Sequence, residues 1–195
     1  TNGMTIPHHL GAVPKMIIVK RLDGSGNWNW QIYHTSLGAT KYLMLNIATS
    51  ASTSSSRWYD VEPTSSVFTL GNDTDVNVND ATFIAYSFSE VPGYSKFAKY
   101  TGNGNAANGP FIYTGFRPTF FLVKRITDGS EPWVLFDNKR QDPRNTVTGI
   151  LKPNLSEAET KQTGGSLDFL SNGVKLKNTD GTFNNDAKEF IYMAF

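Results

Sequence analysis

Residues 115–125 read Gly115-Phe116-Arg117-Pro118-Thr119-Phe120-Phe121-Leu122-Val123-Lys124-Arg125, and residues 11–21 read Gly11-Ala12-Val13-Pro14-Lys15-Met16-Ile17-Ile18-Val19-Lys20-Arg21. Both segments place a glycine three positions before a proline and then run through apolar residues to an identical Val-Lys-Arg. The two prolines are 104 positions apart. A shared pattern at this distance indicates an internal duplication. Internal repeats are identified first because they determine how the rest of a sequence is interpreted.

The segments that follow also correspond in the two halves. Each half continues with an Asp-Gly pair, Asp23-Gly24 or Asp128-Gly129, which favours a turn between two strands. Trp30 and Trp133 then open matching strand-like segments, and both halves close on similar apolar runs. These closing runs read Phe83-Ile84-Ala85-Tyr86-Ser87-Phe88 and Phe190-Ile191-Tyr192-Met193-Ala194-Phe195.

The repeated strand patterns, with almost no helical periodicity, predict an all-β protein. We expect two homologous antiparallel β sub-structures, residues 1–100 and 101–195, packed together as one globular unit. In this interpretation they form a sandwich-like unit in which a pseudo-twofold axis relates the two repeats. Trp30 and Trp133 occupy equivalent places and are expected in the core.

Three polar segments are expected between the strands. Residues 50–56 are rich in serine and too poor in apolar side chains to pack, so we predict a mobile surface loop. Residues 155–161 could form one helical turn, with Ser156 as N-cap and Glu159 completing a capping box. The glycine-rich residues 102–109 are expected to be a flexible connector between the repeats.

The composition excludes several classes of function. The formal net charge is +1 and only 18% of residues are charged, so nothing favours binding to nucleic acid or to an anionic membrane. Cysteine is absent, which excludes disulfides, a thiol nucleophile and cysteine metal ligands. No apolar run approaches the roughly 20 residues of a membrane-spanning helix. Because the sequence starts abruptly at Thr1, we expect it to be a fragment of a longer protein.

Two groups of residues raise the question of a metal site. His8 and His9 are adjacent and would point to opposite faces of a strand, while His34 is matched by Asp137 in the second repeat, so structural roles are favoured. Residues 72–80 place Asn and Asp at alternating positions, which suits either calcium or a turn. The central glycine and terminal glutamate of an EF-hand loop are missing, which favours the turn. We expect no metal and no cofactor.

Carboxylate pairs are present but carry no catalytic signature. Asp60 with Glu62, or Asp137 with Asp142, could in principle serve a glycosidase, which needs a defined separation that a sequence does not give. No serine lies in a nucleophile-elbow context. The sequence therefore predicts a protein that is not an enzyme.

Unmatched aromatic residues provide the candidate ligand site. Trp28, Trp58 and Tyr59 have no counterpart in the second repeat and lie beside Asn29 and Arg57. Aromatic rings next to polar side chains suit a sugar, which has an apolar face and a rim of hydroxyl groups. The alternative is that the same rings pack under a long loop. Residues 141–145 and 157–165, where the repeats also differ, are further places to look for function.

Across its whole length the sequence resembles a family of bacteriophage tail-fibre and related virion proteins. The motifs that carry this resemblance are Ile6-Pro7-His8-His9-Leu10-Gly11, Tyr33-His34-Thr35-Ser36-Leu37-Gly38, Pro63-Thr64-Ser65-Ser66-Val67-Phe68-Thr69-Leu70-Gly71, Gly93-Tyr94-Ser95-Lys96-Phe97, Tyr100-Thr101-Gly102-Asn103-Gly104, Gly109-Pro110-Phe111-Ile112-Tyr113-Thr114-Gly115-Phe116-Arg117-Pro118, Asp168-Phe169-Leu170-Ser171-Asn172-Gly173 and Tyr192-Met193-Ala194-Phe195. Ser87 stands where the family pattern leads us to expect cysteine.

The resemblance implies a distal tail-fibre domain, part of the virion, that binds a host surface glycan such as capsular polysaccharide or lipopolysaccharide during adsorption. It also implies a homotrimer attached to the rest of the fibre on its N-terminal side. A purely structural virion domain and a polysaccharide depolymerase are the two alternatives. Under the leading hypothesis Trp28, Asn29, Arg57, Trp58 and Tyr59 contact the receptor.

Overall fold

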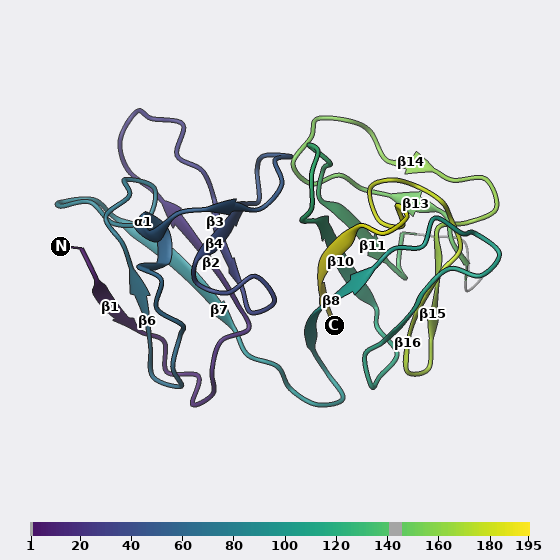
Figure 1. Ribbon diagram of the computed structural model, residues 1–195, viewed down its shortest axis with the longest axis horizontal. Helices are drawn as coiled ribbons and strands as arrows, with labels where there is room; N and C mark the ends of the chain where they lie inside the picture. The colour runs from purple at the N-terminus through teal and green to yellow at the C-terminus, as the bar shows by residue number, and fades with distance from the viewer. Residues whose placement is uncertain (1, 141–145) are drawn as a thin grey trace. The chain divides into compact units, whose positions relative to one another are not determined.

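The computed structural model describes residues 2–140 and 146–195, and nearly all of its regular structure is β-strand (Figure 1). The predicted all-β fold is confirmed. The chain divides into two compact units, Thr1–Glu90 and Val91–Phe195. Within the part of the chain that is described, no helix has the length and apolar character needed to cross a membrane.

The first unit contains one larger and one smaller antiparallel sheet. The larger sheet has the order β5 (Ser52–Thr53), β4 (Lys41–Met44), β3 (Gln31–His34), β2 (Met16–Arg21) and β7 (Phe83–Phe88). The smaller sheet pairs β1 (Met4–Pro7) with β6 (Val67–Leu70), and a short helix, α1 (Ser55–Trp58), precedes β6. Their buried side chains meet in one core: Ile17, Val19, Tyr33, Ala39, Trp58, Phe68, Leu70 and Val76.

The second unit is built from two four-stranded antiparallel sheets and a short pair. One sheet has the order β11 (Val134–Asp137), β10 (Phe120–Arg125), β17 (Glu189–Ala194) and β8 (Lys96–Thr101). The other has the order β12 (Thr146–Val147), β15 (Leu167–Leu170), β16 (Gly173–Leu176) and β9 (Phe111–Tyr113). The strands β13 (Gly149–Ile150) and β14 (Thr160–Lys161) form the pair.

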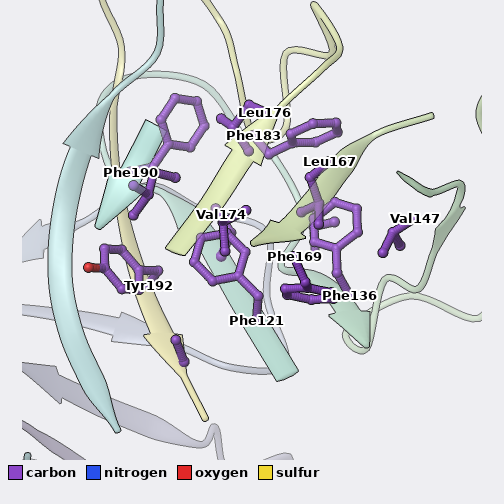
Figure 2. Close-up of a cluster of buried hydrophobic side chains, with 14 of the residues drawn as sticks. Phe121, Phe136, Val147, Leu167, Phe169, Val174, Leu176, Phe183, Phe190 and Tyr192 are labelled. Atoms are coloured by element: carbon purple, nitrogen blue, oxygen red, sulfur yellow. The ribbon is translucent and has the colours of Figure 1, made fainter. Parts of the chain in front are cut away.

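The core of the second unit lies between its two larger sheets. Figure 2 shows Phe121, Phe136 and Tyr192 of one sheet close to Phe169 and Val174 of the other. Side chains alternate along each strand, so one face of each sheet supplies this core. The opposite face of the first sheet is partly buried too, since Leu122, Lys124 and Ile191 lie on it. The second unit is therefore a β-sandwich.

The two units share a strand arrangement. In both, the Val-Lys-Arg strand lies between the strand that follows the Asp-Gly turn and the strand that ends the unit: β2 between β3 and β7, and β10 between β11 and β17. The registers match, since Lys20 lies opposite Ile84 and Lys124 opposite Ile191. These parallels are what a duplication would produce. The duplication itself, with its pseudo-twofold axis, stays a prediction.

Two of the predicted polar segments are structured differently from what we expected. Residues 50–56 are not a plain loop, because Ser52–Thr53 pairs with β4 and Ser54 caps the N-terminus of α1. Residues 155–161 form no helical turn; they lead instead into β14, whose Thr160 lies opposite Ile150. Local propensity predicted these elements incorrectly because strand pairing outweighs it.

The glycine-rich segment and the unit boundary also differ from the prediction. The N–H of Gly102 donates to the carbonyl of Lys188 at 2.9 Å, and the N–H of Gly104 donates to the carbonyl of Asn184 at 3.0 Å. The segment is therefore bound within the second unit instead of being a flexible connector. The boundary falls between Glu90 and Val91, because β8 pairs with β17 along six residues.

Trp133 is buried, as predicted from its match to Trp30, whereas Trp30 is only half-buried. Their backbones are nevertheless held alike. The N–H of Trp30 donates to Oδ1 of Asn46 at 3.0 Å, and that of Trp133 donates to Oδ1 of Asn154 at 2.9 Å. Each asparagine thus satisfies the backbone N–H at the point where the strand begins.

A fully buried lysine makes the stability of the second unit depend on pH. The ammonium of Lys124 donates to the carbonyls of Arg125 and Glu131, and burial lowers the pKa of Lys124 from 10.5 to about 8. Between these values the unfolded state binds more protons than the folded state, so the free energy of unfolding rises with pH. We expect a rise of about 1 kcal/mol between pH 7 and 9 in urea unfolding.

The Lys124→Met variant is the control for this rise, because it keeps the stem of the side chain and removes the titrating group. Its free energy of unfolding should be flat over the same range. The scan stays below pH 9.5 because burial raises the pKa of Tyr33 and Tyr100, whose ionisation acts in the opposite direction. Equal slopes in both proteins would show that Lys124 is not the titrating group.

Candidate functional site

Trp58 lies in the core of the first unit. It is 2% exposed, and its ring meets that of Tyr33 edge-to-face, with centroids 5.9 Å apart. Helix α1 places it there, because Ser54 caps the start of the helix and Trp58, its last residue, contacts Tyr33 of β3. A ring that is closed to solvent offers no face to a sugar. Trp58 therefore packs inside the protein, and its burial speaks against its assignment to the ligand surface.

Trp28 folds back onto its own turn. The guanidinium of Arg21 lies over the indole at 4.1 Å, and Nε1 of Trp28 donates to the carbonyl of Asp23 at 2.8 Å. A Cβ added at Gly26 would lie only 2.5 Å from the ring, so this glycine allows the indole to pack against the turn. Arg21 therefore occupies a ring face that a sugar would need, and the cation–π contact stabilises the closed turn.

Asn29 and Arg57 are brought together by Asp75, which is 7% exposed. Nδ2 of Asn29 donates to Asp75 at 3.3 Å, and Gln31 donates to the same carboxylate at 2.6 Å. Arg57 forms ion pairs with Asp73 and Asp75, and its guanidinium lies over the ring of Tyr42. These contacts join β3, α1 and residues 72–77, so the side-chain amide of Asn29 and the charge of Arg57 are engaged within the protein.

Tyr59 is the one member of the predicted set with a largely exposed side chain, at 44%. It follows α1 in the left-handed conformation, and its N–H donates to the carbonyl of Ser55 at 3.0 Å. Its ring lies against Gly3. Because no other member of the predicted set is exposed beside it, Tyr59 supplies a single ring and no extended aromatic surface on which a sugar could stack.

The other candidates hold loops in place. Glu62 accepts hydrogen bonds from the hydroxyl of Tyr33 and the N–H of Ala39. The Asn- and Asp-rich segment is a turn, as favoured, because the carbonyl of Asp73 accepts from the N–H groups of Val76 and Asn77. In residues 2–140 and 146–195, no group of three or more His, Asp or Glu side chains is placed to hold a metal. Asp142 and the rest of residues 141–145 lie outside the described residues.

The strongest surface candidate lies in the second unit, on edge strand β9. Phe111 and Tyr113 are 46% and 63% exposed, while Ile112 between them is buried in the core. Alternation along the strand therefore puts both rings on the outer face of the β12-β15-β16-β9 sheet. A Cβ added at Gly173 would meet the Phe111 ring at 2.8 Å, so the glycine lets this ring lie across β16.

A polar ladder continues this outer face across the sheet. Lys175 lies opposite Phe111, Asp168 opposite Lys175, and Thr146 opposite Asp168. Residues directly opposite in neighbouring strands share a face. We call the set Phe111, Tyr113, Lys175, Asp168 and Thr146 the aromatic face.

The polar groups of the aromatic face are ordered by contacts with neighbouring side chains and with the backbone. The hydroxyl of Thr146 donates to Asp168 at 2.8 Å, and Lys177 lies 3.3 Å from the same carboxylate. Nζ of Lys175 donates to the carbonyl of Gly109 at 2.5 Å. The face thus combines two exposed rings with fixed donors and acceptors, the combination that recognises an apolar sugar face and its hydroxyl rim.

Comparison with known sequences identifies the family. The chain belongs to the family DUF7483, described as a domain of unknown function. The match to DUF7483 covers residues 1–195, so both units lie within a single family domain. No curated protein and no solved structure matches the chain. For this DUF7483 domain, chemistry has to be inferred from its own surfaces.

The sequence contained a signal for the aromatic face that we did not use. Phe111-Ile112-Tyr113 alternates aromatic, apolar and aromatic residues between Gly109-Pro110 and Gly115. On a strand with one buried face, such a pattern leaves both aromatic rings outside. The search for rings unmatched between the two halves pointed instead to Trp28 and Trp58.

Proposed function

We propose that this domain is a non-catalytic recognition module of a bacteriophage tail fibre that binds a host surface glycan through the aromatic face. The observation that carries the proposal is the pair of exposed rings, Phe111 and Tyr113, side by side on one face of β9. Two neighbouring rings can each stack on a sugar unit, and the ladder beside them offers partners for hydroxyl groups.

The glycan is proposed to be capsular polysaccharide or lipopolysaccharide, and the protein to act as a homotrimer on the virion. Composition supports an extracellular β-protein through its low share of charged residues, 18%, and its polar segments rich in Asn, Ser, Thr and Gly. A shallow face with two rings binds one sugar segment weakly. Three identical faces on one fibre would raise the overall affinity through effective concentration.

Two alternatives are separated from this proposal by one experiment. A structural virion domain would neither bind nor change a polysaccharide, whereas a depolymerase would shorten it. The experiment incubates the domain with an array of bacterial capsular polysaccharides and lipopolysaccharides and then measures both bound protein and chain length. We expect binding to a subset of the array with chain length unchanged. Shortening would favour the depolymerase, and no binding would favour the structural role.

A further inference from the structure

Strand β7 is the final strand of the larger sheet in the first unit, and among the described residues no strand pairs with its outer edge. The corresponding strand of the second unit, β17, is paired on both sides, by β10 and by β8. An open edge is a template for another strand. The first unit thus has no described counterpart of β8 on this edge.

The side chains of β8 show what that strand contributes in the second unit. The Tyr100 ring stacks on Phe190, with centroids 5.1 Å apart and planes inclined by 12°. Its hydroxyl donates to the carbonyl of Phe183 at 2.7 Å. Two residues later, Gly102 exchanges hydrogen bonds with Ala187 and Lys188. Thus β8 supplies an aromatic side chain to the core and then a glycine that lies on the following turn.

The first unit has a cavity at the corresponding place. Its volume is about 370 Å³, and Val76, Phe83 and Ala85 are among the residues that line it. By strand register Phe83 corresponds to Phe190, and Ala85 to Tyr192. These are residues that Tyr100 contacts in the second unit. The cavity is within the size range of ligand pockets, and the residues that would face the ring of an added strand, Phe83 and Ala85, line it.

The turn beside the cavity is also alike in the two units. The carbonyl of Asp73 accepts hydrogen bonds from the N–H groups three and four residues later, at positions 76 and 77. The carbonyl of Asp180 does the same with positions 183 and 184. Asp80 and Ala187, at matching places, both have positive φ, 59° and 54°. In the first unit this turn lines the cavity, whereas in the second unit residues at its end form hydrogen bonds with the backbone of Gly102.

We propose that the edge of β7 and this cavity receive an extended strand with the chemistry of β8, supplied by the same protein from outside residues 1–195. The strand runs antiparallel to β7, places an aromatic ring opposite Phe83, and carries a glycine two residues later. Chain order supports this source. By its pairing, β1 in the first unit corresponds to β9 in the second, and β8 comes directly before β9 in the chain. A counterpart of β8 would therefore come before β1. Pairing along the edge would supply affinity, and the cavity would supply specificity for the ring.

The probe is a synthetic peptide of residues 95–105, Ser95-Lys96-Phe97-Ala98-Lys99-Tyr100-Thr101-Gly102-Asn103-Gly104-Asn105, titrated calorimetrically into the protein of residues 1–195. We expect one peptide to bind per chain, and a peptide with Tyr100→Ala to bind about tenfold more weakly or worse. No binding by the natural peptide would overturn the proposal.

Two exposed positions on β7 provide a matched pair of variants, since Ala85 faces the cavity and Tyr86 faces the opposite side. Ala85→Arg should abolish peptide binding, and Tyr86→Arg should change it by less than about twofold. Equal binding by both variants would show that the peptide exchanges with β8 in the second unit instead. Circular dichroism checks that both variants remain folded.

The same titration tests the source of the strand. In a longer polypeptide that carries its natural residues ahead of Thr1, the site should already be filled, so the peptide should not bind. If the longer polypeptide binds the peptide as well as residues 1–195 do, the strand comes from another chain, and its assignment to the same protein is wrong.

Discussion

Replacing Trp58 by alanine should lower the free energy of unfolding of the first unit by about 3–5 kcal/mol. The indole is closed to solvent and packs edge-to-face on Tyr33 in the core that joins the sheets of this unit. Removing it takes away buried apolar surface and leaves a cavity that the surrounding strands cannot fill. Urea unfolding followed by far-ultraviolet circular dichroism measures the change.

Trp28→Ala is the matched control, because it removes the same side chain from a closed surface turn. It loses one hydrogen bond and one cation–π contact, for which we expect a cost of about 1 kcal/mol. Should Trp58→Ala prevent folding altogether, Trp58→Phe retains much of the volume and should still cost more than Trp28→Ala. Equal, small costs for Trp28→Ala and Trp58→Ala would contradict the placement of Trp58 in the core.

Replacing both Phe111 and Tyr113 by alanine should reduce glycan binding about a hundredfold, or roughly tenfold for each ring. The variant lacks the stacking contact that each ring is expected to make with a sugar unit, while Ile112 remains in the core and preserves β9. Surface plasmon resonance on an immobilised polysaccharide from the array measures the change in affinity.

The control for this pair is Tyr94→Ala in the same unit. Tyr94 is 63% exposed, like Tyr113, but contacts Phe195 and lies outside the aromatic face. It tests whether loss of any exposed tyrosine lowers binding. We expect wild-type affinity for this variant. An equal loss of affinity in Tyr94→Ala and in the double variant would show that the aromatic face is not the glycan-binding surface.

The repeated motif and the alternation of residues were sufficient to predict the all-β fold. Val-Lys-Arg marks corresponding strands, β2 and β10, because a strand whose two faces are both buried carries a continuous apolar run, which is a strong signal. The aspartates of the Asn- and Asp-rich segment were favoured as turn residues because their carboxylates and carbonyls satisfy nearby N–H groups. These are local or periodic properties, which a sequence carries directly.

The candidate site could not be located by the same means. Whether a tryptophan is buried depends on where its element docks, and Trp58 and Trp28 differ because α1 turns one inward while Arg21 covers the other. The open edge of β7 is likewise a property of topology, since its apolar pattern resembles that of β17. Exposure of Phe111 and Tyr113 was readable from alternation, but only for a strand known to have one buried face.

Nuclear magnetic resonance mapping of an oligosaccharide prepared from an array-positive polysaccharide tests the proposed function most directly. Titration into the isotopically labelled domain locates the contact surface residue by residue. We predict that the amide and side-chain shifts that change will cluster at Phe111, Tyr113, Lys175 and Asp168. Changes clustered around Trp28 and Tyr59, with the outer face of β9 unaffected, would contradict this prediction.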